Sequence, residues 1–74
     1  MVKIKSAKDF GKEVRKFRKN NKITQDELAR LANLSRKVII ELEAGKPTIQ
    51  FVVIEKIMKV TNLVLYMEGA SDEA

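Results

Sequence analysis

Residues 24–45 read TQDELARLANLSRKVIIELEAG and decide the fold. Thr24 suits the N-cap of a helix, and Glu27 lies three residues later, where it would complete a capping box. The pattern therefore predicts a short helix over about 25–32. Its expected apolar stripe is Leu28, Ala29, Leu31 and Ala32.

A second helix is expected immediately after the first. Asn33 can adopt positive φ in the tight connection, and Ser35 suits the next N-cap. Gly45 then closes that helix. Its expected buried positions are Ile39 and Leu42. Residues 24–44 therefore predict two capped helices joined by a three-residue turn.

The chain before this pair predicts one more helix. Ser6 followed by Asp9 resembles a capping box, and the pattern beyond it indicates a helix over about 7–20. The apolar positions Phe10, Val14 and Phe17 share one face. Asn20-Asn21 is expected to end the helix, because Asn tolerates the left-handed conformation.

A fourth helix is predicted after Pro47, capped by Thr48 and running to about Val60. Its residues are apolar nearly all round, which indicates cover on more than one side and favours a second subunit.

The sequence closes with a short apolar run that predicts a β-strand over 63–67. A lone strand needs a neighbour for its backbone groups. Val2 and Ile4 could supply an edge strand in the same chain, or a second copy could pair across a two-fold axis. The acidic tail over 69–74 is expected to be flexible.

Length and composition limit the function classes. Seventy-four residues predict a single domain over 1–74, and the chain contains no Cys and no His. Disulfides and thiolate or imidazole metal sites are therefore excluded, and association with another copy is the expected reinforcement. The absence of His, of a glycine-rich phosphate loop and of a nucleophile with a base argues against an enzyme. No metal, cofactor or small-molecule ligand is expected.

Positive charge is concentrated at the start of the chain. Residues 1–22 hold nine Lys or Arg against two acidic residues, whereas the formal net charge of the whole chain is +5. Such a concentration indicates an anionic partner such as nucleic acid, although a solvated basic face stays possible. The start has no apolar signal-peptide core, and no run approaches the ~18 apolar residues of a membrane span. A soluble, cytoplasmic protein without membrane contact is expected.

The two capped helices and the Glu43-Ala44-Gly45-Lys46 segment resemble the lambda-repressor-like, or Xre-type, helix-turn-helix domains over about residues 10–60. The lead-in over 6–11, the join over 45–48 and the closing 62–66 resemble the HipB-type antitoxin regulators. The resemblance implies a mainly α bundle of four to five helices with a C-terminal β-strand that pairs across a dimer. That strand's residues are Leu63, Val64, Leu65, Tyr66 and Met67.

The resemblance also assigns a DNA-binding surface. Gln25 would contact phosphate or an adjacent side chain, and the first turn of the helix after Ser35 would read bases. That turn would be Ser35, Arg36 and Lys37, followed by the outward positions Ile40 and Glu41. Their chemistry fits independently, because Arg and Lys match the O6 and N7 acceptors of guanine and Ser can serve base or phosphate.

Two further pairs come from the resemblance. Lys46 and Thr48 would meet phosphate, while Thr48 is also the expected N-cap. Arg18 and Glu43 would form a buried pair that ties the first helix to the third.

The sequence departs from the family's habits on the DNA-facing helix. Val38 and Ile40 stand where Thr and Ser are common, so they could touch thymine methyl groups or mark a protein-binding face. Glu41 would accept from a cytosine amine or repel phosphate.

The resemblance implies a dimeric, sequence-specific regulator that binds an inverted-repeat operator and represses its own operon as the antitoxin of a kinase-fold toxin. Two alternatives remain: a standalone Xre-type repressor without a toxin, and a helix-turn-helix domain that binds only protein. Salt dependence distinguishes DNA binding from a domain that binds only protein. DNA binding releases counterions from the duplex, so its affinity falls as salt increases.

Overall fold

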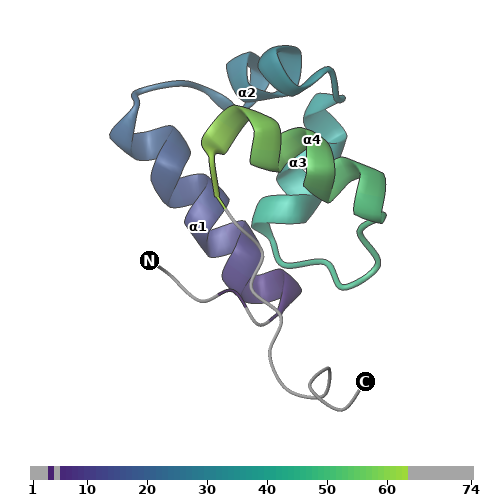
Figure 1. Ribbon diagram of the computed structural model, residues 1–74. Coiled ribbons are helices and arrows are strands. Elements are labelled where there is room, and N and C mark those ends of the chain that lie inside the picture. The colour runs from purple at the N-terminus through teal and green to yellow at the C-terminus, as the bar shows by residue number, and fades with distance from the viewer. Residues whose placement is uncertain (1–3, 5, 64–74) are drawn as a thin grey trace.

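The computed structural model of the chain describes residues 4 and 6–63, which fold into four helices joined by short loops (Figure 1). The helices are α1 (Ala7–Asn20), α2 (Gln25–Ala32), α3 (Arg36–Glu43) and α4 (Phe51–Thr61). The prediction of a mainly α helix-turn-helix bundle is confirmed. Of the strand expected over 63–67, only Leu63 is described; the rest of that strand, Val2 and the tail over 69–74 lie outside the described residues.

Three helices begin at the predicted caps. The Ser6 and Ser35 hydroxyls each accept a hydrogen bond from the backbone amide three residues later, at 3.1 and 3.2 Å. Thr24 and Glu27 form the full capping box, with the Glu27 amide donating to Thr24 and the Thr24 amide donating to the Glu27 carboxylate. These side chains satisfy amides that a helix leaves without internal partners, which is why α1, α2 and α3 start where the sequence predicts.

The predicted start of α4 is wrong. Thr48 is not an N-cap: it lies with Pro47 in a turn, and the helix begins at Phe51 after the cap residue Gln50, which makes no side-chain capping bond. Ile49 is half-buried and packs against the core. The burial of Ile49 keeps the chain outside the helix for two residues beyond Thr48.

The loops after α2 and α3 turn sharply through left-handed residues. Asn33 has φ of 56° and Gly45 has φ of 82°. In each case the next residue's amide reaches back into the helix: Leu34 donates to the Ala29 carbonyl, and Lys46 donates to the carbonyl of residue 41. These bonds satisfy carbonyls that the helix end would otherwise leave open, as the sequence predicts for both residues.

The end of α1 differs from the prediction. The left-handed residue is Lys22, with φ of 56°, and not Asn20 or Asn21. Asn21 instead uses its side-chain amide to donate to the Phe17 carbonyl at 2.8 Å. The Ile23 amide donates to the Arg18 carbonyl, and the Ile23 side chain packs against the core. The anchoring of Ile23 imposes the left-handed conformation on Lys22, although lysine has no intrinsic preference for it.

The core gathers one face from each helix, together with a residue that precedes α1. Its buried apolar members are Ile4, Phe10, Val14, Leu28, Ala29, Ala32, Ile39, Leu42, Val53 and Ile57. The assignment of Leu31 to the apolar stripe of α2 is wrong, because Leu31 is 62% exposed. At roughly 100° per residue, Leu31 lies about a quarter turn or more from the centre of the three buried positions of α2.

α1 and α3 lie in close contact at Gly11. This residue is buried within α1, and a Cβ atom built there would overlap the carbonyl oxygen of Leu42 on α3. The obstacle is backbone, so a side chain at Gly11 would push the two helices apart. Because Gly11 has no side chain, α3 can pack closely against α1 at this position.

Gly11→Ala is therefore expected to lower the free energy of unfolding by about 1–3 kcal/mol, the usual cost of overpacking. Gly→Ala in a helix without such an obstacle would raise the free energy of unfolding by about 1 kcal/mol. The sign of the change therefore shows whether α3 obstructs a side chain at Gly11. Urea unfolding followed by circular dichroism measures it, with the exposed neighbour Lys12→Ala as the control. A stabilised Gly11→Ala protein would mean that α1 and α3 do not touch there.

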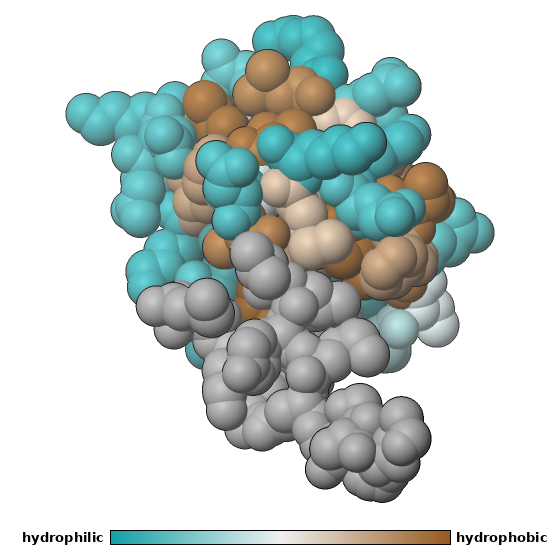
Figure 2. Space-filling view, viewed as in Figure 1, coloured by the Kyte–Doolittle hydropathy of each residue, from teal (hydrophilic) through white to brown (hydrophobic). Residues whose placement is uncertain are grey.

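α4 is only partly covered by the rest of the described chain. Its Val53 and Ile57 are buried, yet Phe51 and Val52 are 59% and 48% exposed. In the space-filling view, apolar surface breaks through the polar cover both over α2 and on the side where α4 begins (Figure 2). The expectation of excess apolar surface on this helix is met at its first turn.

Candidate nucleic-acid interface

The first turn of α3 holds two cations in solvent. Ser35 caps the helix, and Arg36 and Lys37 follow it as exposed residues. The helix dipole disfavours positive charge at this end, and α3 has no acidic residue in its first turn. The dipole of α3 therefore does not explain these cations, whereas an anionic partner would. The Ser35 hydroxyl accepts from the Val38 amide and keeps its proton to donate elsewhere.

One face of α3 lies in the core and the opposite face is open. Ile39 and Leu42 are buried, as predicted, whereas Ile40 is 45% exposed. Ile40 lies one turn after Arg36, so the two share a face. Val38, the other unusual apolar residue of this helix, is half-buried and packs against the core. Of these two unusual apolar residues of α3, Ile40 is therefore the one that offers its side chain to a partner.

The remaining candidates lie near the other end of α3. Glu41 is half-buried, and its Oε2 lies 3.3 Å from the Lys46 ammonium nitrogen. Thr48 is exposed in the turn that follows. The carboxylate of Glu41 is therefore engaged by Lys46 within the protein, which reduces its repulsion of an approaching phosphate.

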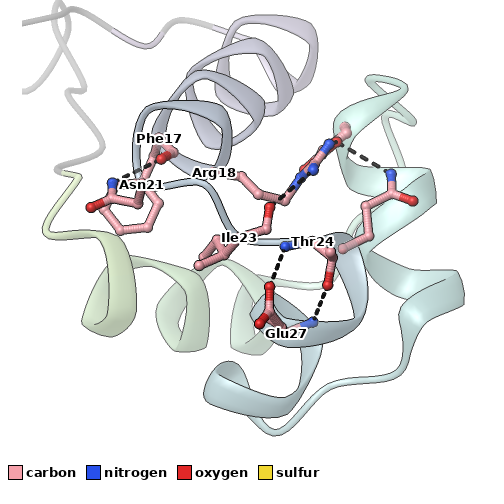
Figure 3. A network of polar contacts seen from close by, with 8 residues as sticks. Phe17, Arg18, Asn21, Ile23, Thr24 and Glu27 are labelled. Carbon is pink, nitrogen blue, oxygen red and sulfur yellow. Dashed lines mark hydrogen bonds and ion pairs between the residues drawn. The ribbon is translucent and has the colours of Figure 1, made fainter.

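Arg18 of α1, labelled in Figure 3, forms an ion pair with Glu43 of α3. Arg18 Nε and Nη2 donate to the two carboxylate oxygens of Glu43 at 2.8 and 3.0 Å, and Nη1 donates to the Ile23 carbonyl at 3.2 Å. The two side chains are only 12% and 6% exposed. Gln25, at the start of α2, also donates to Glu43 at 3.3 Å. One carboxylate thus joins α1, α2 and α3.

This pair stabilises the charged form of Arg18. Hydrogen bonding to Glu43, aided by charge attraction, raises the pKa of the Arg18 guanidinium above its ordinary value, although burial opposes the shift. A raised pKa means that the stabilisation is fully present at lower pH and is lost only at still more alkaline pH. Titration of Arg18 therefore does not weaken the scaffold near neutral pH.

An open hollow of about 820 Å³ lies where the end of α1 meets the starts of α2 and α3. It collects Gln25, Arg36 and Ile40 from the sequence-predicted surface. The other candidates, Ser35, Lys37, Glu41, Lys46 and Thr48, do not line it. The predicted surface is therefore divided between this hollow and the neighbouring parts of α3 and its following turn.

The hollow adds three residues that the sequence analysis did not single out as site residues. Arg15, Lys19 and Lys22, which we call the basic rim, are exposed and line it. None of the three forms an ion pair within the described part of the chain. Their signal was the positive charge of residues 1–22, but the sequence could not show which of the nine cations would gather beside Arg36.

Two other kinds of site are absent from residues 4 and 6–63. No group of three or more acidic side chains there is placed to hold a metal ion. Within the same residues, every helix is too short or too polar to cross a bilayer.

Comparison with known proteins also identifies a helix-turn-helix domain. The family model described as Helix-turn-helix (HTH_3) matches residues 14–64. An uncharacterised HTH-type transcriptional regulator, y4mF of Sinorhizobium fredii (strain NBRC 101917 / NGR234), is 48% identical over 48 residues, which are 65% of this chain and 63% of the relative. This chain thus matches less than two thirds of the relative's length.

Solved structures share the fold. A HipB–O4 20mer complex contains a chain that superposes with a TM-score of 0.79 at 22% identity, over 96% of this chain and 100% of that chain. A structure of MDT Protein superposes with a TM-score of 0.78, also at 22% identity, with coverage of 96% and 100%. At this identity the similarity establishes the arrangement of helices.

Proposed function

Because this chain belongs to the helix-turn-helix family, we propose that it is a sequence-specific DNA-binding transcriptional regulator that reads the major groove with the first turn of α3. The observation that carries this proposal is the pair Arg36 and Lys37, two exposed cations at the helix end where the dipole disfavours them. The name of the y4mF relative, a transcriptional regulator, supports the same reading.

Phosphate contacts would hold the domain on the duplex. The basic rim and Gln25 line the hollow beside Arg36, and we expect them to follow one DNA strand while α3 enters the groove. Gln25 uses one amide hydrogen on Glu43 and keeps the other for a phosphate oxygen. Lys46 and Thr48 would meet the backbone on the far side of α3. Phosphate contacts of this kind position the protein but carry no direct sequence information.

Base contacts would come from the exposed residues of α3. Arg36 and Lys37 would donate to guanine, and the Ser35 hydroxyl can serve a base or a phosphate. Ile40, 45% exposed, would touch a thymine methyl group. Glu41 would accept from a cytosine amine when Lys46 turns to phosphate. These roles together predict a mixed, not a purely A·T-rich, recognition sequence.

A homodimer is part of the proposal. Phe51 and Val52 leave apolar surface open at the start of α4, and the strand predicted over 63–67 needs a partner strand. Two copies related by a two-fold axis would read an inverted repeat with half-sites about 34 Å apart. A monomeric mass by light scattering at micromolar concentration would remove the dimer from the proposal.

The most specific form of the proposal is an autorepressing antitoxin that also binds a kinase-fold toxin. The fold shared with the chain in the HipB–O4 20mer complex supports it. Co-expression with the product of the adjacent gene tests it: suppression of that product's toxicity would support the antitoxin role. A harmless neighbour would favour a standalone repressor acting in the cytoplasm.

Selection from a pool of randomised duplexes tests sequence-specific binding directly. The proposal predicts that the recovered duplexes share an inverted repeat with at least one guanine in each half-site. Recovery of unrelated sequences would contradict specificity. In that case Ile40, Phe51 and Val52 would instead indicate a surface for protein partners.

A further inference from the structure

Two residues of opposite charge face each other across the helix-turn-helix. Arg36 Nε, on the first residue of α3, lies 3.7 Å from Asp26 Oδ1, on the second residue of α2. Both side chains are about three-fifths exposed, at 61% and 62%, and both line the hollow. A carboxylate is thus placed in the surface that is proposed to meet DNA.

We infer that Asp26 is a positioning residue that orients Arg36 for guanine. The close approach joins Arg36 Nε to Asp26 Oδ1, so in the proposed arrangement the carboxylate would hold the guanidinium at Nε while its two terminal amino groups face the base. Those two groups are the pair that can donate to the O6 and N7 acceptors of one guanine. This inference rests on the proposed function, since it concerns how the same surface selects its base.

Asp26 lies in the first turn of α2, where the helix dipole favours an acidic residue, but it has no role in the cap of that helix. Thr24 and Glu27 already form the capping box of α2, so Asp26 is not needed as a cap. An exposed ion pair of this kind contributes little to stability. Glu43, the other acidic residue that lines the hollow, already accepts hydrogen bonds from Arg18 and Gln25. Asp26 is therefore the carboxylate of the hollow that can act on Arg36.

The inferred role predicts two opposite effects on DNA binding. A negative charge beside the basic rim repels phosphate at every sequence, so it weakens non-specific binding. The same charge restricts Arg36, a flexible side chain that would otherwise turn to the nearest phosphate. Asp26 would therefore reduce affinity for unrelated DNA and increase discrimination at the base that Arg36 contacts.

Asp26→Asn tests this inference because it removes the charge and keeps the size. The probes are the duplex recovered by selection, its single-base variants, and a scrambled duplex. At one position, we expect the preference for guanine to fall about fivefold or more, the lower end of what a bidentate contact supplies. Binding to the scrambled duplex should become tighter. In an Arg36→Ala background, Asp26→Asn should leave the preference at that position unchanged.

The matched control is Asp9→Asn, the same change in the first turn of α1, outside the hollow. It should leave base preference at wild-type level. If the wild-type protein shows a base preference and Asp26→Asn keeps it in full, the inference is overturned while the proposed function stands. If the wild-type protein itself shows no base preference, the proposed function fails first.

Discussion

Glu43→Ala is expected to lower the free energy of unfolding by about 3–5 kcal/mol, the usual effect of removing one partner from a buried ion pair. Glu43 accepts three hydrogen bonds, two from Arg18 and one from Gln25. Its removal leaves the Arg18 guanidinium, 12% exposed, without a counter-charge. It also releases the contact that joins α3 to α1 and α2.

Urea unfolding followed by circular dichroism measures this effect. A domain of this size commonly has only about 3–5 kcal/mol of stability, so Glu43→Ala should be largely unfolded. Glu43→Gln keeps one acceptor oxygen and should give an intermediate loss. Glu55→Ala is the matched control, because Glu55 is exposed on α4 and has no ion pair with the rest of the described chain. A loss from Glu43→Ala no larger than about 1 kcal/mol, the range of exposed pairs, would contradict the scaffold role.

Neutralising the basic rim is expected to give the largest loss of DNA affinity. The triple variant Arg15→Gln, Lys19→Gln, Lys22→Gln removes three proposed phosphate contacts. The slope of log K against log salt should become less steep by about 2.7, and affinity at about 0.15 M salt should fall about 100-fold. Because phosphate contacts are independent of sequence, specific and scrambled duplexes should lose affinity together.

A second triple variant controls for net charge. Lys8, Lys12 and Lys16 are exposed on the same helix but do not line the hollow, so their replacement by Gln removes the same charge elsewhere on α1. This control should weaken binding far less, through long-range attraction alone. Equal losses for the two triple variants would mean that the DNA does not lie over the hollow.

The helix starts were the most predictable part of the fold. Ser6, Thr24 and Ser35 each cap a helix, because a hydroxyl that satisfies an amide three residues later is a local contact. Thr48 failed as a cap for a non-local reason. The burial of Ile49 against the core keeps that part of the chain outside the helix, and no pattern of neighbouring residues predicts such packing.

The difference between local contacts and non-local packing also explains which other predictions were correct and which were wrong. The left-handed conformation was foreseen at Asn33 and Gly45, whose residue types permit it, but not at Lys22, where it is imposed by the anchoring of Ile23. Leu31 is of a residue type that is common in cores, yet its angular position on α2 leaves it exposed. No sequence pattern marks Gly11 as a contact residue, and its role follows only from the packing of α3 against it.

The candidate site was predictable in part. The proposed base-reading turn of α3 follows from its residue types and from the family resemblance, and the structure places Arg36 and Ile40 on one open face. The basic rim and Asp26 were not predicted as site residues. Their placement depends on how the end of α1 and the first turn of α2 meet beside α3, which sequence spacing does not determine.

The most direct test of the central claim, that this helix-turn-helix surface reads DNA, is a fluorescence-anisotropy titration at two salt concentrations. The two probes are a duplex from immediately upstream of the protein's own gene and a scrambled duplex of the same composition. We expect tighter binding to the upstream duplex, with both affinities weakening as salt increases. Equal binding to the two duplexes, with no dependence on salt, would contradict a DNA-reading role for α3.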